Sequence, residues 1–90
     1  MLKKFWNVTI LDVDPARGKL TIYRKKREAG QVTHMLTTVF AGAMAKIKDT
    51  SGKSLKLSDI EPRDKATMGY MIESGALIAS HIVIDKYERR

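Results

Sequence analysis

The chain has 90 residues, a formal net charge of +7 and 43% hydrophobic residues, and it contains no cysteine. Ninety residues can close one small core and not two, and this apolar content is typical of a globular domain rather than a disordered one. The lack of cysteine excludes disulfides, thiolate metal sites and cysteine nucleophiles. We therefore expect one domain over residues 1–85 and a charged tail over residues 86–90.

Residues 5–13 form the first predicted strand. Trp6, Val8 and Ile10 recur at spacing two, as expected when every second side chain of a strand faces a core. Leu11 then breaks this spacing, because it is apolar and directly follows Ile10. Such a change of phase predicts a β-bulge at that point.

A turn and a second strand follow. Residues 14–18 (DPARG) combine a proline that fixes φ with a glycine that tolerates positive φ, which predicts a tight turn. Residues 19–26 then place Leu20 and Ile22 on one face of a strand.

Residues 27–30 (REAG) are predicted to close a hairpin onto a third strand, residues 31–40. Strict alternation there predicts two faces, one with Val32, His34, Leu36, Thr38 and Phe40 and the other with Met35 and Val39. Because His34 shares its face with apolar neighbours, we expect it to be a partly buried structural residue.

The middle of the chain is less regular. Small residues at 41–47 (AGAMAKI) predict a tight bend, and residues 49–54 (DTSGKS) predict a loop. Residues 55–64 predict an Asx/Ser turn with one helical turn, which Pro62 prevents from continuing.

The last elements are a second predicted hairpin, with strands at 65–72 and 76–84. The apolar residues of the later strand fit one buried face only if the phase changes around Ser80, which again predicts a bulge.

Five or six short strands with two phase breaks predict an all-β fold. A small closed barrel suits them best, because closure removes the exposed edges of an open sheet. We predict an OB-like barrel, with an SH3-like barrel as the alternative.

Three sequence frames carry a resemblance. They are VDPARGKLT at 13–21, SLKLSDIEPRDKAT at 54–67 and ESGALIASHIVI at 73–84. On these frames the chain resembles a bacterial family of small OB-like domains of unknown function, over about residues 8–84. The resemblance implies the fold and no reaction. Members of that family often have glycine where Arg63 stands, and many are exported or attached to other domains.

The predicted barrel also resembles the periplasmic copper-binding chaperones of metal efflux systems. Those proteins use one histidine, two methionines and a tryptophan on adjacent strands. The residue types are present here, but no Met-x-Met pair exists, and His34 and Met35 are neighbours whose side chains point to opposite faces of a strand. The similarity is therefore expected at the level of the fold alone.

A basic stretch is the best candidate binding site. Residues 1–27 hold eight Lys/Arg against Asp12 and Asp14, so the positive charge lies mainly in the first part of the chain. Cations beside an aromatic ring favour single-stranded nucleic acid, whereas a solvated hairpin kept soluble by its charge is the alternative. The predicted nucleic-acid-binding residues are Tyr23, Arg24, Lys25, Lys26, Arg27, Lys46 and Lys48.

Soft donors are the second candidate. Imidazole and thioether groups together suit Cu(I), and His34, Met35 and Met44 are the residues that could supply them. Methionine is also an ordinary filler of small, irregular cores, so no metal site is predicted as the main interpretation.

Catalysis is not predicted, because the paired carboxylates lie beside turns and no phosphate-cradling loop is present. We expect a non-catalytic binding module without a cofactor, with an anionic partner. A protein–protein interaction module of a bacterial assembly is the alternative, and a Cu(I) carrier is the second one. No signal-peptide core and no stretch of transmembrane length occurs in the sequence. This predicts a cytoplasmic protein if Met1 is the natural start, and an exported one if a leader precedes it.

Overall fold

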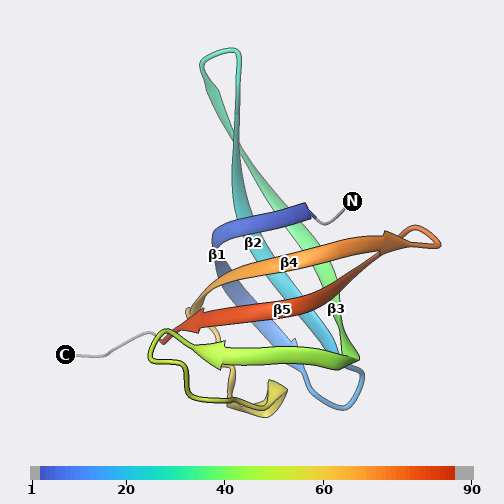
Figure 1. Cartoon of the computed structure of the whole chain (residues 1–90). Coiled ribbons are helices and arrows are strands. Elements are labelled where there is room, and N and C mark those ends of the chain that lie inside the picture. Colours follow the sequence, from blue (N-terminus) through green and yellow to red (C-terminus); the bar gives the residue numbers. More distant parts are fainter. Residues whose placement is uncertain (1–2, 87–90) are drawn as a thin grey trace.

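The computed structural model describes residues 3–86 as a closed barrel of five strands (Figure 1). Around the barrel the strands follow the order β1-β2-β3-β5-β4, and every neighbouring pair is antiparallel except β3 and β5. The predicted all-β, OB-like barrel is thereby confirmed. No helix within residues 3–86 has the length and apolarity needed to cross a membrane. The elements are β1 (Lys3–Asp14), β2 (Lys19–Glu28), β3 (Gln31–Asp49), the single-turn 3-10 helix η1 (Leu57–Asp59), β4 (Lys65–Glu73) and β5 (Ala76–Asp85).

The core fills the inside of the barrel with one inward-facing row from each strand. Alternation along the strands sends every second side chain inward, so that branched apolar residues meet at the barrel axis. Burial of each large side chain contributes about 1.5–3 kcal/mol to folding. The fully buried residues of most volume are Ile10, Leu20, Ile22, Val39, Met68, Ile82 and Ile84, together with the carboxylate of Asp64.

Two bulges lie where the phase of the sequence changes. In the pairing of β1 with β2, Ile10 and Asp12 face consecutive residues of β2, which leaves Leu11 unpaired and exposed. In the pairing of β4 with β5, Gly69 pairs with His81 and the next pair involves residue 79, so Ser80 is the extra residue. Both predicted bulges are confirmed.

A third bulge in β1 was not predicted. Trp6 and Asn7 together oppose Thr67 of β4, and Asn7 adopts a φ of 49°. The bulge turns Phe5 inward and Trp6 outward, with 70% of Trp6 exposed. The expectation that Trp6 shares a face with Val8 was therefore wrong, because an extra residue separates the two phases.

β3 is longer than predicted and closes the barrel. Its first part pairs with β2 and its second part pairs with β5, and its register with β5 breaks between Ala41 and Lys46. The predicted bend at 41–47 is therefore a bend inside one strand. The amide of Ala41 donates to the carbonyl of Gly18 at 2.8 Å, and a Cβ on Gly18 would lie 3.2 Å from the Ala41 carbonyl oxygen. This close approach, with a φ of 63°, explains the glycine.

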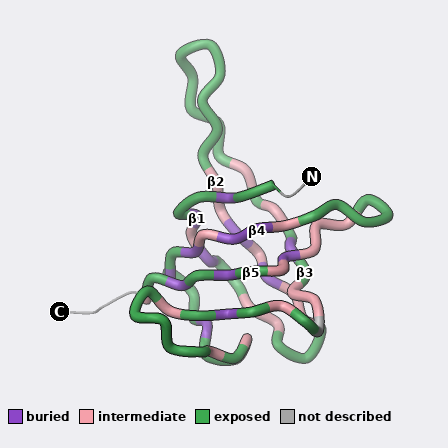
Figure 2. The backbone as a smooth tube through the Cα atoms, in the orientation of Figure 1, coloured by how far each residue is buried: buried purple, intermediate pink, exposed green. Residues whose placement is uncertain are grey.

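The far half of the β2–β3 hairpin rises above the barrel as a two-stranded ribbon (Figures 1 and 2). Every residue from 25 to 34 is exposed, since no second layer covers either face of the ribbon. His34 is therefore exposed, and so is Leu36, at 68%. The expectation of a partly buried His34 was wrong, because alternation shows which residues share a face and not whether that face is covered.

A buried ion pair fastens the end of β5 to the segment before β4. The Asp64 carboxylate is 1% exposed and accepts from Lys86 Nζ at 2.7 Å and from the Glu61 amide at 2.9 Å. Lys86 Nζ also donates to the Asp59 carbonyl at 2.7 Å. Lys86 was assigned to the charged tail, yet its ammonium belongs to this contact, while residues 87–90 of that tail lie outside the described part of the chain.

The turn before β4 is tied to the middle of β1. The Arg63 amide donates to the Ile10 carbonyl, and the Ile10 amide donates to the Asp64 carbonyl, both at 2.8 Å. Arg63 adopts a φ of 81°, the left-handed region that favours glycine. Arg63 therefore occupies a backbone conformation that a glycine would adopt without strain.

Removal of either partner of the Asp64–Lys86 pair should destabilise the barrel. Asp64→Ala removes the acceptor of the Glu61 amide and of Lys86, and Lys86→Met removes an ammonium 2.7 Å from a buried carboxylate, so each should lower the free energy of unfolding by about 2 kcal/mol. Asp14→Ala is the control, since the exposed Asp14–Arg17 pair at 3.8 Å should contribute less than about 1 kcal/mol. Urea unfolding measures all three, and equal small losses would contradict the assignment.

The loop after β3 is organised by the Asp49 carboxylate. Its Oδ1 accepts from the Ser51 hydroxyl at 2.6 Å, from the Ser51 amide at 2.9 Å and from the Lys53 amide at 3.0 Å. These donors, the Ser51 hydroxyl first, lower the pKa of Asp49 below its ordinary value of 3.8. Because the pKa is lower in the folded protein, the ionised carboxylate stabilises the loop at any pH above the ordinary pKa of Asp. This stabilisation is lost as the pH falls through the lowered pKa of the folded protein.

Ser51→Ala should raise the pKa of Asp49 toward its ordinary value, because the largest of these effects is removed. As the pH is lowered, the amides of residues 51 and 53 should then lose their protection against exchange at a higher pH than in the parent protein. NMR titration of the side-chain carboxyl measures the change. Ser54→Ala is the matched control and should leave the Asp49 titration where it is; an unchanged Asp49 in Ser51→Ala would contradict the account.

Candidate nucleic-acid interface

The predicted basic run divides into two parts. Tyr23 and Arg24 are half-buried where the hairpin leaves the barrel, whereas the following cations are exposed on the ribbon. Lys26 Nζ pairs with Glu28 at 3.0 Å, which offsets part of the charge near the tip.

Arg24 is held in place by the barrel. Its guanidinium carbon lies 4.7 Å from the centre of the Phe5 ring, and its Nε donates to Thr37 Oγ1 at 3.0 Å. Stacking on an aromatic ring together with a directed hydrogen bond fixes the plane of the guanidinium. Arg24 therefore presents a positive charge at a defined position, unlike the ribbon lysines.

A depression of about 420 Å³ lies between the bulged part of β1 and the base of the hairpin. We call it the basic–aromatic cleft. It is lined by Trp6, Asn7, Val8, Thr9, Tyr23, Arg24, Lys25 and Lys65.

Trp6 reaches the cleft because of the β1 bulge. The extra residue turns the indole out of the core, and the Asn7 amide donates to Thr67 Oγ1 at 3.1 Å, which fixes the bulge against β4. Lys4 Nζ lies 5.0 Å from the centre of the Trp6 ring, so a cation already stands over part of this aromatic surface. Trp6 was not among the predicted site residues. The adjacent aromatic residues at positions 5 and 6 could have indicated that either of them can face the core.

Tyr23 is oriented by His34. The two rings stack with centroids 5.3 Å apart and an angle of 19° between their planes, and the tyrosine hydroxyl forms a hydrogen bond with His34 Nδ1. His34 is thus placed to support an aromatic side chain of the cleft rather than to form part of the core.

Lys65 adds a third cation from β4. Its Nζ donates to Thr9 Oγ1 at 2.7 Å, so the ammonium lies across β1 at the edge of the cleft. Together with Lys25 it places positive charge beside the two aromatic rings, whereas the guanidinium of Arg24 lies on the other face of β2, against Phe5 and Thr37. A ligand with both an anionic group and a planar aromatic group would satisfy this arrangement.

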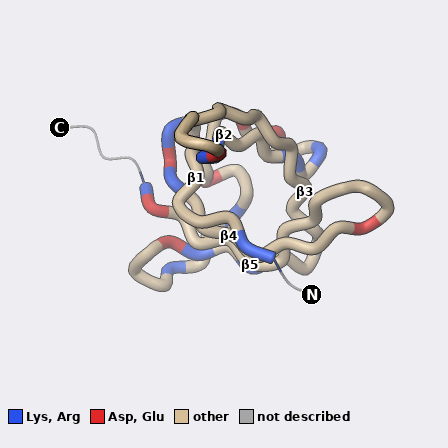
Figure 3. The backbone as a smooth tube through the Cα atoms, turned by 90° about the horizontal axis from the view of Figure 1, so that it is seen from above, with Lys and Arg blue, Asp and Glu red and all other residues tan. Residues whose placement is uncertain are grey.

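Lys46 and Lys48 lie elsewhere, on the outer face of β3 past its bend. With His81, Ile82 and Val83 they line a separate depression of about 270 Å³. The seven predicted residues therefore do not form one cluster. Viewed from above, Lys and Arg occur around the barrel and not on one side only (Figure 3).

The soft donors are not brought together. His34 is on the Tyr23 side of the ribbon, while Met35 Sδ lies 3.9 Å from Arg24 Nη2. Met44 lies past the bend and is 91% exposed. Within residues 3–86 no group of three or more His, Cys, Asp or Glu side chains converges on a common point.

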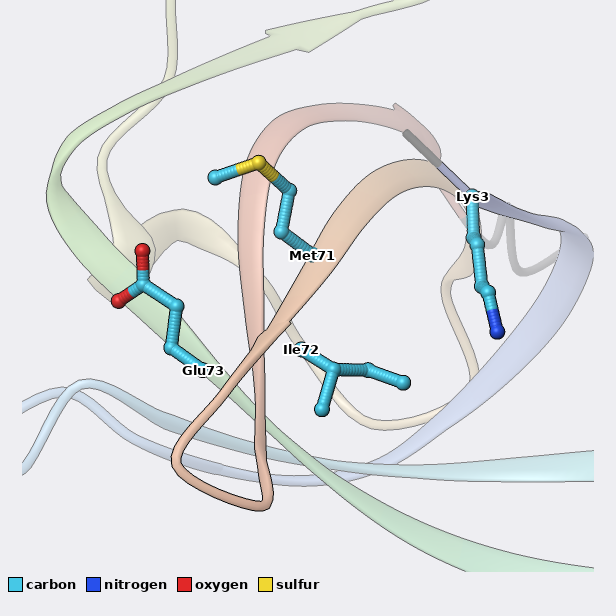
Figure 4. Close-up of a pocket in the computed structure, with 4 residues that line it drawn as sticks. All are labelled: Lys3, Met71, Ile72 and Glu73. Atoms are coloured by element: carbon cyan, nitrogen blue, oxygen red, sulfur yellow. The ribbon is translucent and has the colours of Figure 1, made fainter. Parts of the chain in front are cut away.

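Another depression of about 420 Å³ lies at the β4–β5 hairpin and is lined by Lys3, Met71, Ile72 and Glu73 (Figure 4). Met71 and Glu73 extend from one side of β4, whereas Ile72 extends from the other side toward Lys3. Because these side chains diverge, they offer no convergent set of polar groups to a ligand.

Comparisons with known proteins identify a similar fold but no family. No family model matches the chain, and no curated protein matches it. Among solved structures, the crystal structure of Ag(I)CusF is similar with a TM-score of 0.68, over 94% of this chain and 99% of that one, at 14% sequence identity. The predicted fold-level similarity to a soft-metal-binding OB-type barrel is thereby confirmed, and at this identity the likeness shows the fold alone.

Proposed function

We propose that this domain is a non-catalytic module that binds single-stranded nucleic acid at the basic–aromatic cleft. The observation that supports the proposal is the convergence of Trp6 and Tyr23 with Lys25 and Lys65 around one depression. Bases stack on exposed aromatic rings and phosphates are attracted to the cations beside them, which is how single strands are bound without reading their sequence.

The exposure of Trp6 favours a single strand over a duplex. A ring that is 70% exposed offers its face to a base, but the faces of paired bases in a duplex are already covered by their neighbours. The volume of about 420 Å³ is within the range of small ligand sites and suits one stacked base with its phosphate.

Trp6 should supply much of the affinity. Trp6→Ala should weaken binding of an oligothymidylate by about 1–3 kcal/mol, on the order of ten- to hundredfold in Kd, because one base loses its stacking partner. Trp6→Phe is the matched control and should retain most of the affinity. Anisotropy of a labelled oligonucleotide measures Kd for each variant, and equal affinity of the alanine and parent proteins would sink the proposal.

The cations should set the salt dependence. Phosphate contacts to Lys25 and Lys65 predict that log K falls against log salt with a slope of about −1.4, and Lys25→Ala and Lys65→Ala should each reduce that slope by about 0.7. Arg17→Ala removes the same charge from the β1–β2 turn and should leave the slope unchanged. Oligonucleotide binding with no salt dependence would contradict phosphate contacts by these lysines.

The Cu(I) carrier is the second candidate, because the fold is similar to that of Ag(I)CusF. The separation of His34, Met35 and Met44 does not favour it. Titration with Ag(I) should therefore give no saturable signal at one equivalent in the methionine methyl region of the NMR spectrum. Joint shifts of the His34 ring and the methionine methyl groups that saturate at one equivalent would favour the carrier over the nucleic-acid module.

A further inference from the structure

The basic–aromatic cleft continues into two further depressions. Beside it lies one of about 220 Å³, which shares Asn7 and Lys65 with the cleft and adds Thr50, Thr67 and other side chains of β4 and β5. This middle depression in turn shares Val83 with the depression of about 270 Å³ at Lys46 and Lys48. Each of the three hollows therefore shares lining residues with the next.

The register of the sheet explains this continuity. Lys48 pairs with Val83 and Val83 pairs with Thr67, all with their side chains on the outside of the barrel. Two residues away on β4, and on the same face, Lys65 pairs with Thr9, which pairs with Tyr23 of β2. Paired residues in neighbouring strands point to the same face of a sheet, so these side chains form a row that crosses the strands.

We infer that one nucleic-acid strand follows this row across all five strands, from the basic–aromatic cleft to Lys46 and Lys48. The inference rests on the proposed function and extends it by naming the path and the length of the ligand. We call this path the girdle, and it consists of the side chains that line the three depressions.

The length of the girdle sets the size of the ligand. Neighbouring strands are about 4.8 Å apart, so the four steps from β2 through β1, β4 and β5 to β3 span about 19 Å. At about 3.4 Å per stacked nucleotide, this distance corresponds to about five to six nucleotides. Such a length lies within the usual site size of one OB-type barrel.

Charge is not uniform along the girdle. Lys65, between the cleft and the middle depression, and Lys46 and Lys48 at the far end supply cations, whereas the rest of the middle depression contains threonine hydroxyls and the carboxylate of Asp85, whose residue pairs with Lys65. Phosphates should therefore be held at the two ends, and Asp85 should repel the segment between them. Asp85→Asn is expected to increase the affinity for a strand that spans both ends.

A duplex cannot follow the same path. Double-stranded DNA bends on the scale of its persistence length of about 50 nm, far more than the width of the barrel, whereas a single strand can curve around it. A duplex can touch one end of the girdle at a time.

The test is a length series of oligothymidylates, from about two to about eight nucleotides, titrated by NMR and by the fluorescence of the single tryptophan, Trp6. In the parent protein, affinity should rise until about five or six nucleotides and then level off. The salt slope should steepen by about 1.4 between the shortest and the longest ligands, because two further phosphates are contacted. Shifts should extend to His81 with the long ligands alone.

The decisive variant is the double substitution Lys46→Ala with Lys48→Ala. It should bind the shortest oligonucleotides with the affinity of the parent protein, but its affinity should not rise with oligonucleotide length. Lys53→Ala with Lys56→Ala is the matched control, since it removes the same charge from a part of the surface outside the three depressions and should keep that gain. Asp85→Asn should bind the long ligands more tightly, a gain that a damaged fold cannot produce.

The outcomes separate the two proposals. Binding at the cleft with no gain with length, or a gain that persists in the Lys46/Lys48 double variant, would overturn the girdle and leave the cleft standing. The absence of binding at every length would overturn the proposed function, and the girdle with it.

Discussion

The parallel pairing of β3 with β5 is the constraint on which the rest of the structure depends. β3 can reach both β2 and β5 only because it bends after Phe40, where Gly18 allows the backbone of the first turn to approach Ala41. Closure then brings residues distant in sequence into rows that run across the strands. The placement of Lys65 beside Tyr23, and of both on the path toward Lys48, is a consequence of barrel closure and not of any local motif.

Irregularities in the sheet decide what the surface presents. A regular β1 would have left Trp6 on the inner face, but the bulge with Asn7 turns it outward into the cleft. Because the indole is exposed, the core contains the Phe5 ring in its place. Phe5 stacks on Tyr70 with their ring centroids 4.1 Å apart. The same Phe5 ring packs against the Arg24 guanidinium, so one core side chain also fixes a cation at the base of the hairpin.

Much of the fold could be predicted from the sequence, because alternation, turn residues and phase breaks are local. The bulges at Leu11 and Ser80 follow from apolar residues that change phase, and the turns follow from their glycines. At Phe5 and Trp6 two aromatics of similar hydrophobicity stand side by side, so the pattern gives no way to choose the inward one. His34 is exposed because the hairpin leaves the barrel before this residue, and Lys65 lines the cleft because β4 is a neighbour of β1. Neither feature can be predicted from the alternation of residues along a strand.

The order of strands also has a consequence for synthesis. β5, the last strand made, lies between β3 and β4, while β1, the first, pairs with β4. A chain still growing on the ribosome therefore holds two unpaired strand edges until residues 76–85 emerge, and the edge of β1 that does not face β2 pairs only with β4, about sixty residues later. Contacts of such long sequence separation slow folding, and exposed edges invite association with other chains. Pairing of β5 with both β3 and β4, secured by the contact of Lys86 with Asp64, thus determines when the nascent protein no longer exposes these edges.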